Sequence, residues 1–595
     1  MTHEGIDGGM DEGMDDPRAQ AEGEVSMARL ALADGETGQA AAHVAAALAH
    51  DPALPEAHEM LARLLAGPGG GPDLFPLDEP VFLGTALARA HALAARGEHV
   101  PALRLLISVQ RHEPVGRWAH VPWVLDPELP GRIPPGELCS LVSLLASGLP
   151  GAVPEDGREA LLPYVALVRG GLRAHPDDAS LLWLASLLLR RVGEAEEAAE
   201  LAARSYALAP SFQAALAEGY ACRDLQRWPE AERAMVRALE HDPANLALYT
   251  DIGEMLHSSG RPEEGLEWVE RALRREPRHP NAYPTACGMR FERDGDVRHL
   301  VELADHLRDD PGNEHGDAVL GDHCALRLWL GRVPGPTESV IDVLYQVVEQ
   351  EDVPAGGELT VSAPEPPSAL LAFSLVVPGF AVTVADAPEP DARLTVPEVY
   401  GHGPVRSVAR RVWRYEGVTA APAVPPPSRE ALEAVAAVAT LRWPHLPAAY
   451  DHAVRLSGLS LGDLLGVLAH PPLSPYGEPV AVPLWIRQVQ AWACLGIAHH
   501  RAGQAWAESE RRSVLTDLAY GPEDWVTEAA LLAMIATAWV DPDARGDVAE
   551  LVAWRYLAAV EASRTRPVTI LGSLAALVLA TPGMHPDVRA LAADA

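Results

Sequence analysis

The sequence predicts a mainly α protein: an α-solenoid of helix pairs, with a small β-rich module and a helical C-terminal region. Three observations support this. Prolines recur every 33 or 34 residues, at Pro176, Pro210, Pro243, Pro277 and Pro311. Small residues occupy fixed positions between them. Short β-branched runs broken by Pro and Gly are concentrated in residues 355–418. A fixed period of this size is typical of stacked supersecondary units rather than of one globular core.

The N-terminal part is expected to begin with a disordered acidic tail at residues 1–20, which are rich in Gly, Asp and Glu. Repeat-like helix pairs follow in residues 21–116, interrupted by a Gly/Pro linker at 67–72. Residues 117–178 are interpreted as a helical connection, and a second repeat array is expected over 179–350.

Five good copies of the repeat span 21–54, 83–116, 179–211, 212–245 and 246–279, and a degenerate sixth copy spans 280–313. Each good copy has mostly small residues at its eighth, twentieth and twenty-seventh positions and proline at its thirty-second. Small side chains allow two antiparallel helices to approach closely. Four copies have glycine at the fifteenth position, where a left-handed residue would end the first helix: Gly35, Gly97, Gly193 and Gly260. Proline then ends the second helix.

This pattern resembles the tetratricopeptide repeat (TPR) family. The resemblance implies a right-handed superhelix whose concave face binds peptides or partner proteins. It also implies which first-helix side chains face that groove: Trp183, Leu187, Arg190, Arg191, Gln213, Tyr220, Arg223, Asp224, Thr250, Asp251, Glu254, His257, Asn281, Phe291 and Glu292. Trp183 could instead be buried beneath a neighbouring helix. Repeats that clamp a chaperone's C-terminal carboxylates use lysines, and this chain has none.

The remaining segments are a β-rich module at 355–418, a proline-rich linker, and a helical, solenoid-like domain at 428–595. Within that domain, Asp541-Pro542-Asp543-Ala544-Arg545 is similar to a HEAT-type repeat turn. A single copy supports that similarity.

Composition excludes several functional classes. All 47 basic residues of the 595 are arginine, so Walker and Schiff-base lysines are excluded. The net charge of −36 disfavours nonspecific binding to nucleic acid or to an anionic membrane. Five scattered cysteines, the lack of a signal segment and the lack of a run of ~18 apolar residues predict a cytoplasmic protein. The Ala, Arg, Gly and Pro abundance is typical of a bacterial protein from a GC-rich genome.

No catalytic residue, metal ligand or cofactor is predicted. The letters Gly458-Leu459-Ser460-Leu461-Gly462 fit a hydrolase nucleophile elbow, but that turn needs a preceding strand, and the segment before it looks helical. Ser460 with Asp463 is instead expected to cap a helix. The histidines near residues 299–323 lack metal-ligand spacing.

The sequence therefore favours a non-enzymatic scaffold or adaptor that binds protein or peptide partners through the concave repeat groove. One alternative is an enzyme or regulatory subunit with an unrecognised site in the β-rich or C-terminal region. Another is a regulator whose solenoid changes curvature when it binds a peptide.

Overall fold

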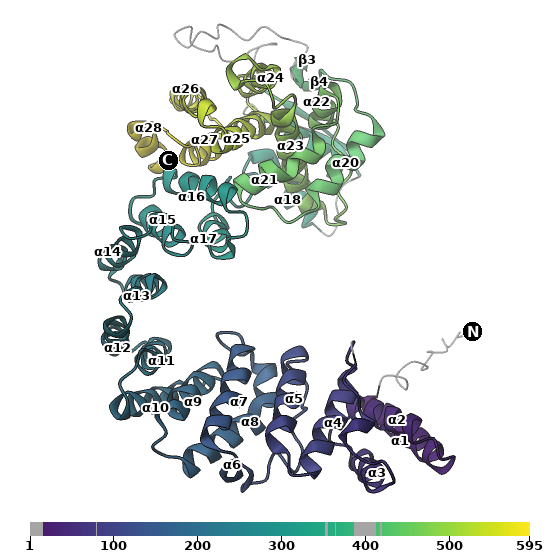
Figure 1. The fold of residues 1–595 in the computed structure, drawn as a ribbon. Helices are drawn as coiled ribbons and strands as arrows, with labels where there is room; N and C mark the ends of the chain where they lie inside the picture. Colours follow the sequence, from purple (N-terminus) through teal and green to yellow (C-terminus); the bar gives the residue numbers. More distant parts are fainter. Residues whose placement is uncertain (1–15, 79, 351–354, 363–364, 386–411, 417–418) are drawn as a thin grey trace, which may run out of the picture. The chain divides into compact units, whose positions relative to one another are not determined.

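The computed structural model describes residues 16–78, 80–350, 355–362, 365–385, 412–416 and 419–595 (Figure 1). Most of the predicted acidic tail lies outside these residues. The first helix begins at Pro17, so the predicted tail is wrong for residues 17–20. The Asp16 side chain accepts a hydrogen bond from the Arg18 N–H and caps this helix, and proline suits its first position because no N–H is needed there.

The chain forms two compact units, Met1–Trp268 and Val269–Ala595. The division falls within α14 (Pro262–Leu273), inside the array predicted for 179–350. The two units are described separately below.

The first unit is entirely helical in its described residues. Its elements are α1 (Pro17–Ala33), α2 (Thr37–His50), α3 (Pro55–Ala66), η1 (Pro72–Leu74), α4 (Leu83–Ala95), α5 (His99–His112), α6 (Leu129–Arg132), α7 (Pro135–Ser147), α8 (Glu155–Ala174), α9 (Ala179–Arg191), α10 (Ala195–Leu208), α11 (Phe212–Asp224), α12 (Trp228–His241), α13 (Leu246–Ser258) and the start of α14. The good repeat copies each hold one helix pair: α1–α2, α4–α5, α9–α10, α11–α12 and α13–α14.

The turn between the two helices of a pair has the left-handed residue that the sequence predicts. Gly35, Gly97, Gly193 and Gly260 have φ values of 80°, 81°, 94° and 86°. In the copy at 212–245 the same turn is made by Gln226, with φ 56°. A side chain with a Cβ is strained in this region, so this copy keeps the turn at an energetic cost.

The small residues of the repeat allow close helix contact. A Cβ added to Gly265 would lie 2.5 Å from the Gly253 carbonyl oxygen, and one added to Gly219 would lie 2.7 Å from Met235 Cγ. The absence of a side chain at these two positions therefore lets the helices of their pairs approach this closely.

The second unit begins with the end of α14, followed by α15 (Ala282–Asp294) and α16 (Arg298–Asp309), the helix pair of the degenerate sixth copy. The next helices, α17 (Glu314–Cys324) and α18 (Ser339–Val348), lie beyond that copy. The β-rich module then places β1 (Gly357–Val361) parallel to β2 (Phe380–Val384). The helix α19 (Pro367–Val376) connects them, so the segment predicted as a β-rich module also contains a helix. A second ladder pairs β3 (Trp413–Glu416) with β4 (Thr419–Pro422), antiparallel.

The C-terminal helices are α20 (Arg429–Ala439), α21 (Leu446–Ala453), α22 (Leu461–Ala469), α23 (Val482–His499), α24 (Glu510–Ala519), α25 (Trp525–Val540), α26 (Arg545–Ser563), α27 (Leu571–Leu579) and α28 (Pro586–Ala593). Nearly every residue of α23 and α25 is buried, so the other elements pack around these two helices. One hydrophobic core runs from Cys287 to Ala592. The predicted boundaries near 350 and 418 therefore do not separate independent cores.

One described helix, Pro479–His499, is long and apolar enough to cross a membrane by length and composition. The sequence predicts no such segment, because it has no uninterrupted run of ~18 apolar residues. In the structure, 72% of its most apolar window is buried within the second unit. A helix buried in a protein core and a helix that crosses a membrane have the same apolar composition, because each is surrounded by apolar groups.

Candidate partner-binding site

The first helices of three successive copies, α9, α11 and α13, bring together five charged or aromatic residues. We call Arg190, Tyr220, Arg223, Asp224 and Asp251 the Tyr220 cluster. All five were predicted from the TPR resemblance as groove residues. Helical periodicity places them on one side of their helices, and each repeat adds one layer.

Direct contacts link the three layers. Arg190 Nη1 donates to Asp224 Oδ2 at 2.9 Å, between copies one repeat apart. The Tyr220 hydroxyl donates to Asp251 Oδ2 at 2.6 Å. The Arg190 and Arg223 guanidinium carbons lie 5.5 and 4.8 Å from the centre of the Tyr220 ring. These distances are within the range of cation–π attraction.

The surroundings of Tyr220 keep its hydroxyl protonated, so that it acts as a hydrogen-bond donor in the cluster. Burial, followed by the nearby Asp251 carboxylate, raises the pKa of the Tyr220 phenol. Tyr220 therefore stays protonated near neutral pH and remains the donor to Asp251. The Arg190 side chain is only 11% exposed, whereas Arg223 and Asp224 are each 34% exposed. Arg223 is thus the cation of this cluster that an incoming partner can reach most easily.

This geometry is chemically suited to recognition. A guanidinium whose carbon lies 4.8 Å from an aromatic ring centre still has N–H donors that can bind a carboxylate or a carbonyl oxygen. The 3.6 Å separation between Arg223 Nε and Asp224 Oδ1 leaves that ion pair loose. The cluster therefore offers one positioned donor group and two carboxylates on a rigid helical support.

The other predicted groove residues of the first unit differ in exposure. Gln213 is exposed near the start of α11, and Trp183, Leu187, Glu254 and His257 are half-buried on α9 and α13. Half-burial leaves part of each of these side chains available at the surface.

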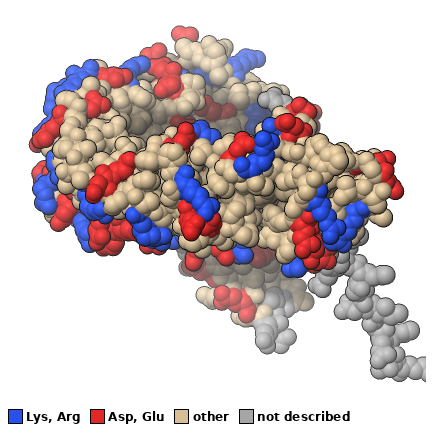
Figure 2. Space-filling view, turned by 60° about the horizontal axis from the view of Figure 1, so that its bottom comes forward, with Lys and Arg blue, Asp and Glu red and all other residues tan. Residues whose placement is uncertain are grey.

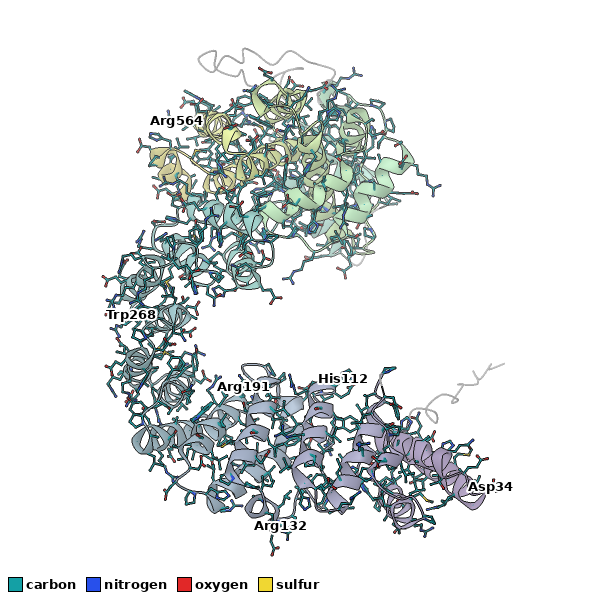
Figure 3. The ribbon with its side chains drawn as sticks, in the orientation of Figure 1. Asp34, His112, Arg132, Arg191, Trp268 and Arg564 are labelled. Atoms are coloured by element: carbon teal, nitrogen blue, oxygen red, sulfur yellow. The ribbon has the colours of Figure 1, made fainter. Side chains whose placement is uncertain are left out.

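Three predicted groove residues have other roles. Arg191 donates to the carbonyls of Ala146 and Leu149 at the end of α7, the second at 2.9 Å (Figure 3). It satisfies helix-end carbonyls rather than facing a partner. Thr250 is 3% exposed, and its hydroxyl donates to the Leu246 carbonyl one turn earlier. Phe291 is 5% exposed and belongs to the core of the second unit. The burial of Thr250 and Phe291 contradicts the groove prediction for these two residues, whereas Arg191 is half-buried and uses its guanidinium within the fold.

Asn281 and Glu292 belong to the second unit with Phe291. Asn281 is half-buried at the N-terminal end of α15, where its side chain makes no capping hydrogen bond, and Glu292 is exposed near the end of that helix. The candidate site is therefore restricted to the first unit.

Sequence reasoning missed a buried ionic cluster in the second unit. Arg487 of α23 donates to Glu528 of α25 and, at 3.2 Å, to Ser573, and it lies 3.8 Å from Glu338. The Arg487, Glu338 and Glu528 side chains are 3%, 2% and 0% exposed. The sequence signal that could have indicated this cluster is a single Arg or Glu within a largely apolar helix, Arg487 in α23 and Glu528 in α25.

The buried cluster has two carboxylates for one guanidinium. Burial raises the pKa of Glu338 to about 7 and that of Glu528 to about 8, with Arg487 opposing the shift in both. An extra proton is therefore held near neutral pH. The indole N–H of Trp525 also donates to Glu338 at 2.7 Å.

Two further predictions concern chemistry in the second unit. Ser460 accepts from the Asp463 N–H at 3.0 Å and caps α22, as expected, and a helical turn rather than a strand precedes it. Beside the described part of the β-rich module, Trp413, Asp517 and Asp524 line a cavity of about 20 Å³. That volume is enough for about one water molecule.

On the face drawn in Figure 2, arginine and acidic side chains are interspersed in small groups, with broad uncharged areas between them. The net charge of −36 does not form one continuous acidic field on that face.

No protein-family model matches the chain, and no curated protein matches it. Several solved structures do. The MamA protein is 18% identical, covering 30% of this chain and 97% of its own, with a TM-score of 0.25. YrrB, a TPR protein with an unusual peptide-binding site, is 15% identical, covering 30% and 88%, with a TM-score of 0.24. A TPR protein from Parabacteroides merdae is 13% identical, covering 51% and 98%, with a TM-score of 0.26.

The chain is built on tetratricopeptide-type helix pairs. This assignment rests on the helix pairs themselves, with their left-handed turns and close glycine contacts. The alignments with solved structures cover only part of the chain.

Proposed function

We propose that this protein is a non-enzymatic scaffold or adaptor, and that its first unit binds a peptide or protein partner through the face formed by α9, α11 and α13. The Tyr220 cluster is the observation that supports this proposal. It joins three repeat layers and leaves Arg223 accessible beside two carboxylates.

The rigidity of the cluster favours a binding role. Arg190 and Tyr220 are fixed by hydrogen bonds from one repeat to the next, so little side-chain entropy is lost when a partner binds. Tyrosine and arginine are also the residue types that most often dominate binding energy at interfaces.

The proposal includes a partner that is a protein or peptide rather than nucleic acid or membrane, since a net charge of −36 repels polyanions. It also includes a cytoplasmic location, supported by five cysteines that are all free thiols in the structure.

Affinity capture from native cell extract tests the proposal. The wild-type chain would be compared with a Tyr220→Ala, Arg223→Glu double variant. Arg233→Glu is the matched control, because Arg233 lies on the second helix α12 and its side chain is 68% exposed. A partner that is retained by wild type and by the control but lost by the double variant supports the proposal. A partner set that is identical for all three proteins refutes it.

A further inference from the structure

A groove of about 1400 Å³ lies within the second unit and is separate from the site proposed above. Three C-terminal helices, α26, α27 and α28, form most of its lining. The end of α15 and the segment after α17 complete one edge. All of its lining residues belong to the same compact unit.

The α26 wall presents a second apolar face of that helix. Gly546, Ala549, Ala553 and Leu557 recur at helical spacing along the groove, and Trp554 beside them is 39% exposed. A neighbouring side of α26, about 100° around the helix and including Val548, Val552 and Tyr556, is buried in the core. Since one apolar side of α26 packs in the core and another lines the groove, the groove side can still pack against a further element.

The rest of the lining is also largely small or apolar. Ala576, Leu579 and Ala580 come from the end of α27 and the residue after it, and Val588 and Ala593 come from α28. Small residues allow a backbone to approach closely. A volume of about 1400 Å³ corresponds to roughly three turns of a helix ~10 Å in diameter.

The groove's charges are unequally placed. One edge of the groove is formed by the end of α15, the start of α16, the segment after α17, and α28. On this edge, Arg327 lies 4.7 Å from the centre of the Phe291 ring and donates to the His323 carbonyl. Arg327 makes no ion pair with a carboxylate of the described residues.

The remaining charges of that edge leave a surplus of cations. Arg298 and Arg589 share the single carboxylate of Asp296, at 2.5 and 3.0 Å. Asp294, the other lining aspartate there, is held by His299 at 3.1 Å and by Arg293 at 3.3 Å. These aspartates are therefore occupied.

The α26 wall has the opposite character. Glu550 is exposed at the groove and has no ion pair among the described residues. The groove lining thus combines a surplus of arginine on one edge, one carboxylate on α26 and a largely apolar remainder.

We propose that this groove binds one amphipathic α-helix of a partner protein. Its apolar ridge would lie between α26 and α28, with carboxylates along the Arg327 edge and a basic residue beside Glu550. Helix-in-groove recognition uses apolar anchors at i, i+3, i+4 and i+7 with charges at the rim, which is the pattern that this lining complements.

Selection from a display library of helical peptides of about 16 residues, roughly four turns, tests the proposal on the full chain. Peptides are selected on wild type and counter-selected on Ala553→Arg, which fills the groove. We expect the selected peptides to combine an apolar ridge with Asp or Glu along one edge. If no peptide distinguishes wild type from Ala553→Arg, or if the selected edges are basic, the proposal is overturned.

One fluorescently labelled peptide from this selection is then titrated by fluorescence anisotropy. Arg327→Glu and Trp554→Ala are each expected to weaken its binding at least about tenfold, which is ~1.4 kcal/mol. Arg564→Glu is the matched control, because Arg564 directly follows the last residue of α26 (Figure 3) and its side chain is 69% exposed. Arg564 is not among the residues that line the groove. Exchanging the acidic peptide residues for arginine should restore binding to Arg327→Glu.

Equal binding by Arg327→Glu and Arg564→Glu would overturn the proposal, provided that circular dichroism shows both variants folded. Light scattering tests the other occupant, a second copy of this chain. A concentration-dependent dimer that is abolished by Ala553→Arg would assign the groove to self-association and reject the partner helix.

Discussion

The left-handed turn at Gln226 allows the repeat architecture to be tested at a single residue. Four copies have glycine at this turn, and one has Gln226 with φ 56°. We predict that Gln226→Gly stabilises the first unit, and that Gly260→Gln, the reciprocal change, destabilises it. Gly260 is a clean reference, because a Cβ there would meet no atom within 4 Å, so only backbone conformation is perturbed.

The magnitude follows from two opposing contributions. An L-residue in the left-handed region costs about 1–2 kcal/mol relative to glycine. Glycine gives back about 0.5–1 kcal/mol, since the unfolded chain becomes more flexible. The difference between these contributions is about 0–1.5 kcal/mol, so the expected net gain from Gln226→Gly is centred on about 0.75 kcal/mol, and the loss from Gly260→Gln should be similar.

Urea unfolding followed by circular dichroism measures the free-energy change. Hydrogen exchange localises it, and protection of the α11 and α12 amides should rise in Gln226→Gly. A Gln226→Gly protein no more stable than wild type, together with an unaffected Gly260→Gln protein, would refute the argument that this turn requires left-handed backbone.

Two other predictions concern packing and buried charge. Gly265→Ala should lower the free energy of unfolding of the first unit by about 1–3 kcal/mol, because its Cβ would overlap the Gly253 carbonyl; equal denaturation midpoints for Gly265→Ala and wild type would contradict this. In the second unit, burial raises the pKa of Glu528 from 4.5 to about 8, so between these pH values the folded state keeps a proton that the unfolded state loses. The free energy of unfolding should therefore fall as the pH rises from 4.5 to 8, by up to about 1.4 kcal/mol per pH unit. Glu528→Gln should flatten this dependence of unfolding free energy on pH, measured by urea titrations at pH 6, 7 and 8 with tryptophan fluorescence. The exposed control Glu561→Gln should leave the dependence unchanged. Equal pH dependence in wild type and Glu528→Gln would count against the raised pKa.

The helix pairs could be predicted because their determinants are local. A glycine at the turn and a proline after the second helix act through backbone conformation, and the TPR resemblance then identified Arg190, Tyr220, Arg223, Asp224 and Asp251 by position in the repeat. The sequence-based prediction of these positions needed no knowledge of long-range contacts.

The errors involve contacts between residues far apart in the chain. Arg191 and Phe291 occupy positions like those of true surface residues, but their environment is set by the end of α7 and by the core of the second unit. The pairing of Arg487 with Glu528 likewise depends on how α23 packs on α25. Periodicity within one segment does not report such partners.

Site-specific photo-crosslinking tests the central claim most directly, because it maps the bound surface without changing the Tyr220 cluster. A photoreactive p-benzoylphenylalanine replaces Gln213, which is exposed on the first helix α11, or, as control, Arg233, which is exposed on the second helix α12. We predict that in native extract the residue at 213 crosslinks to a discrete protein partner and the residue at 233 does not. Crosslinks to that partner from position 233 alone would contradict the assignment of the α9, α11 and α13 face as the binding surface.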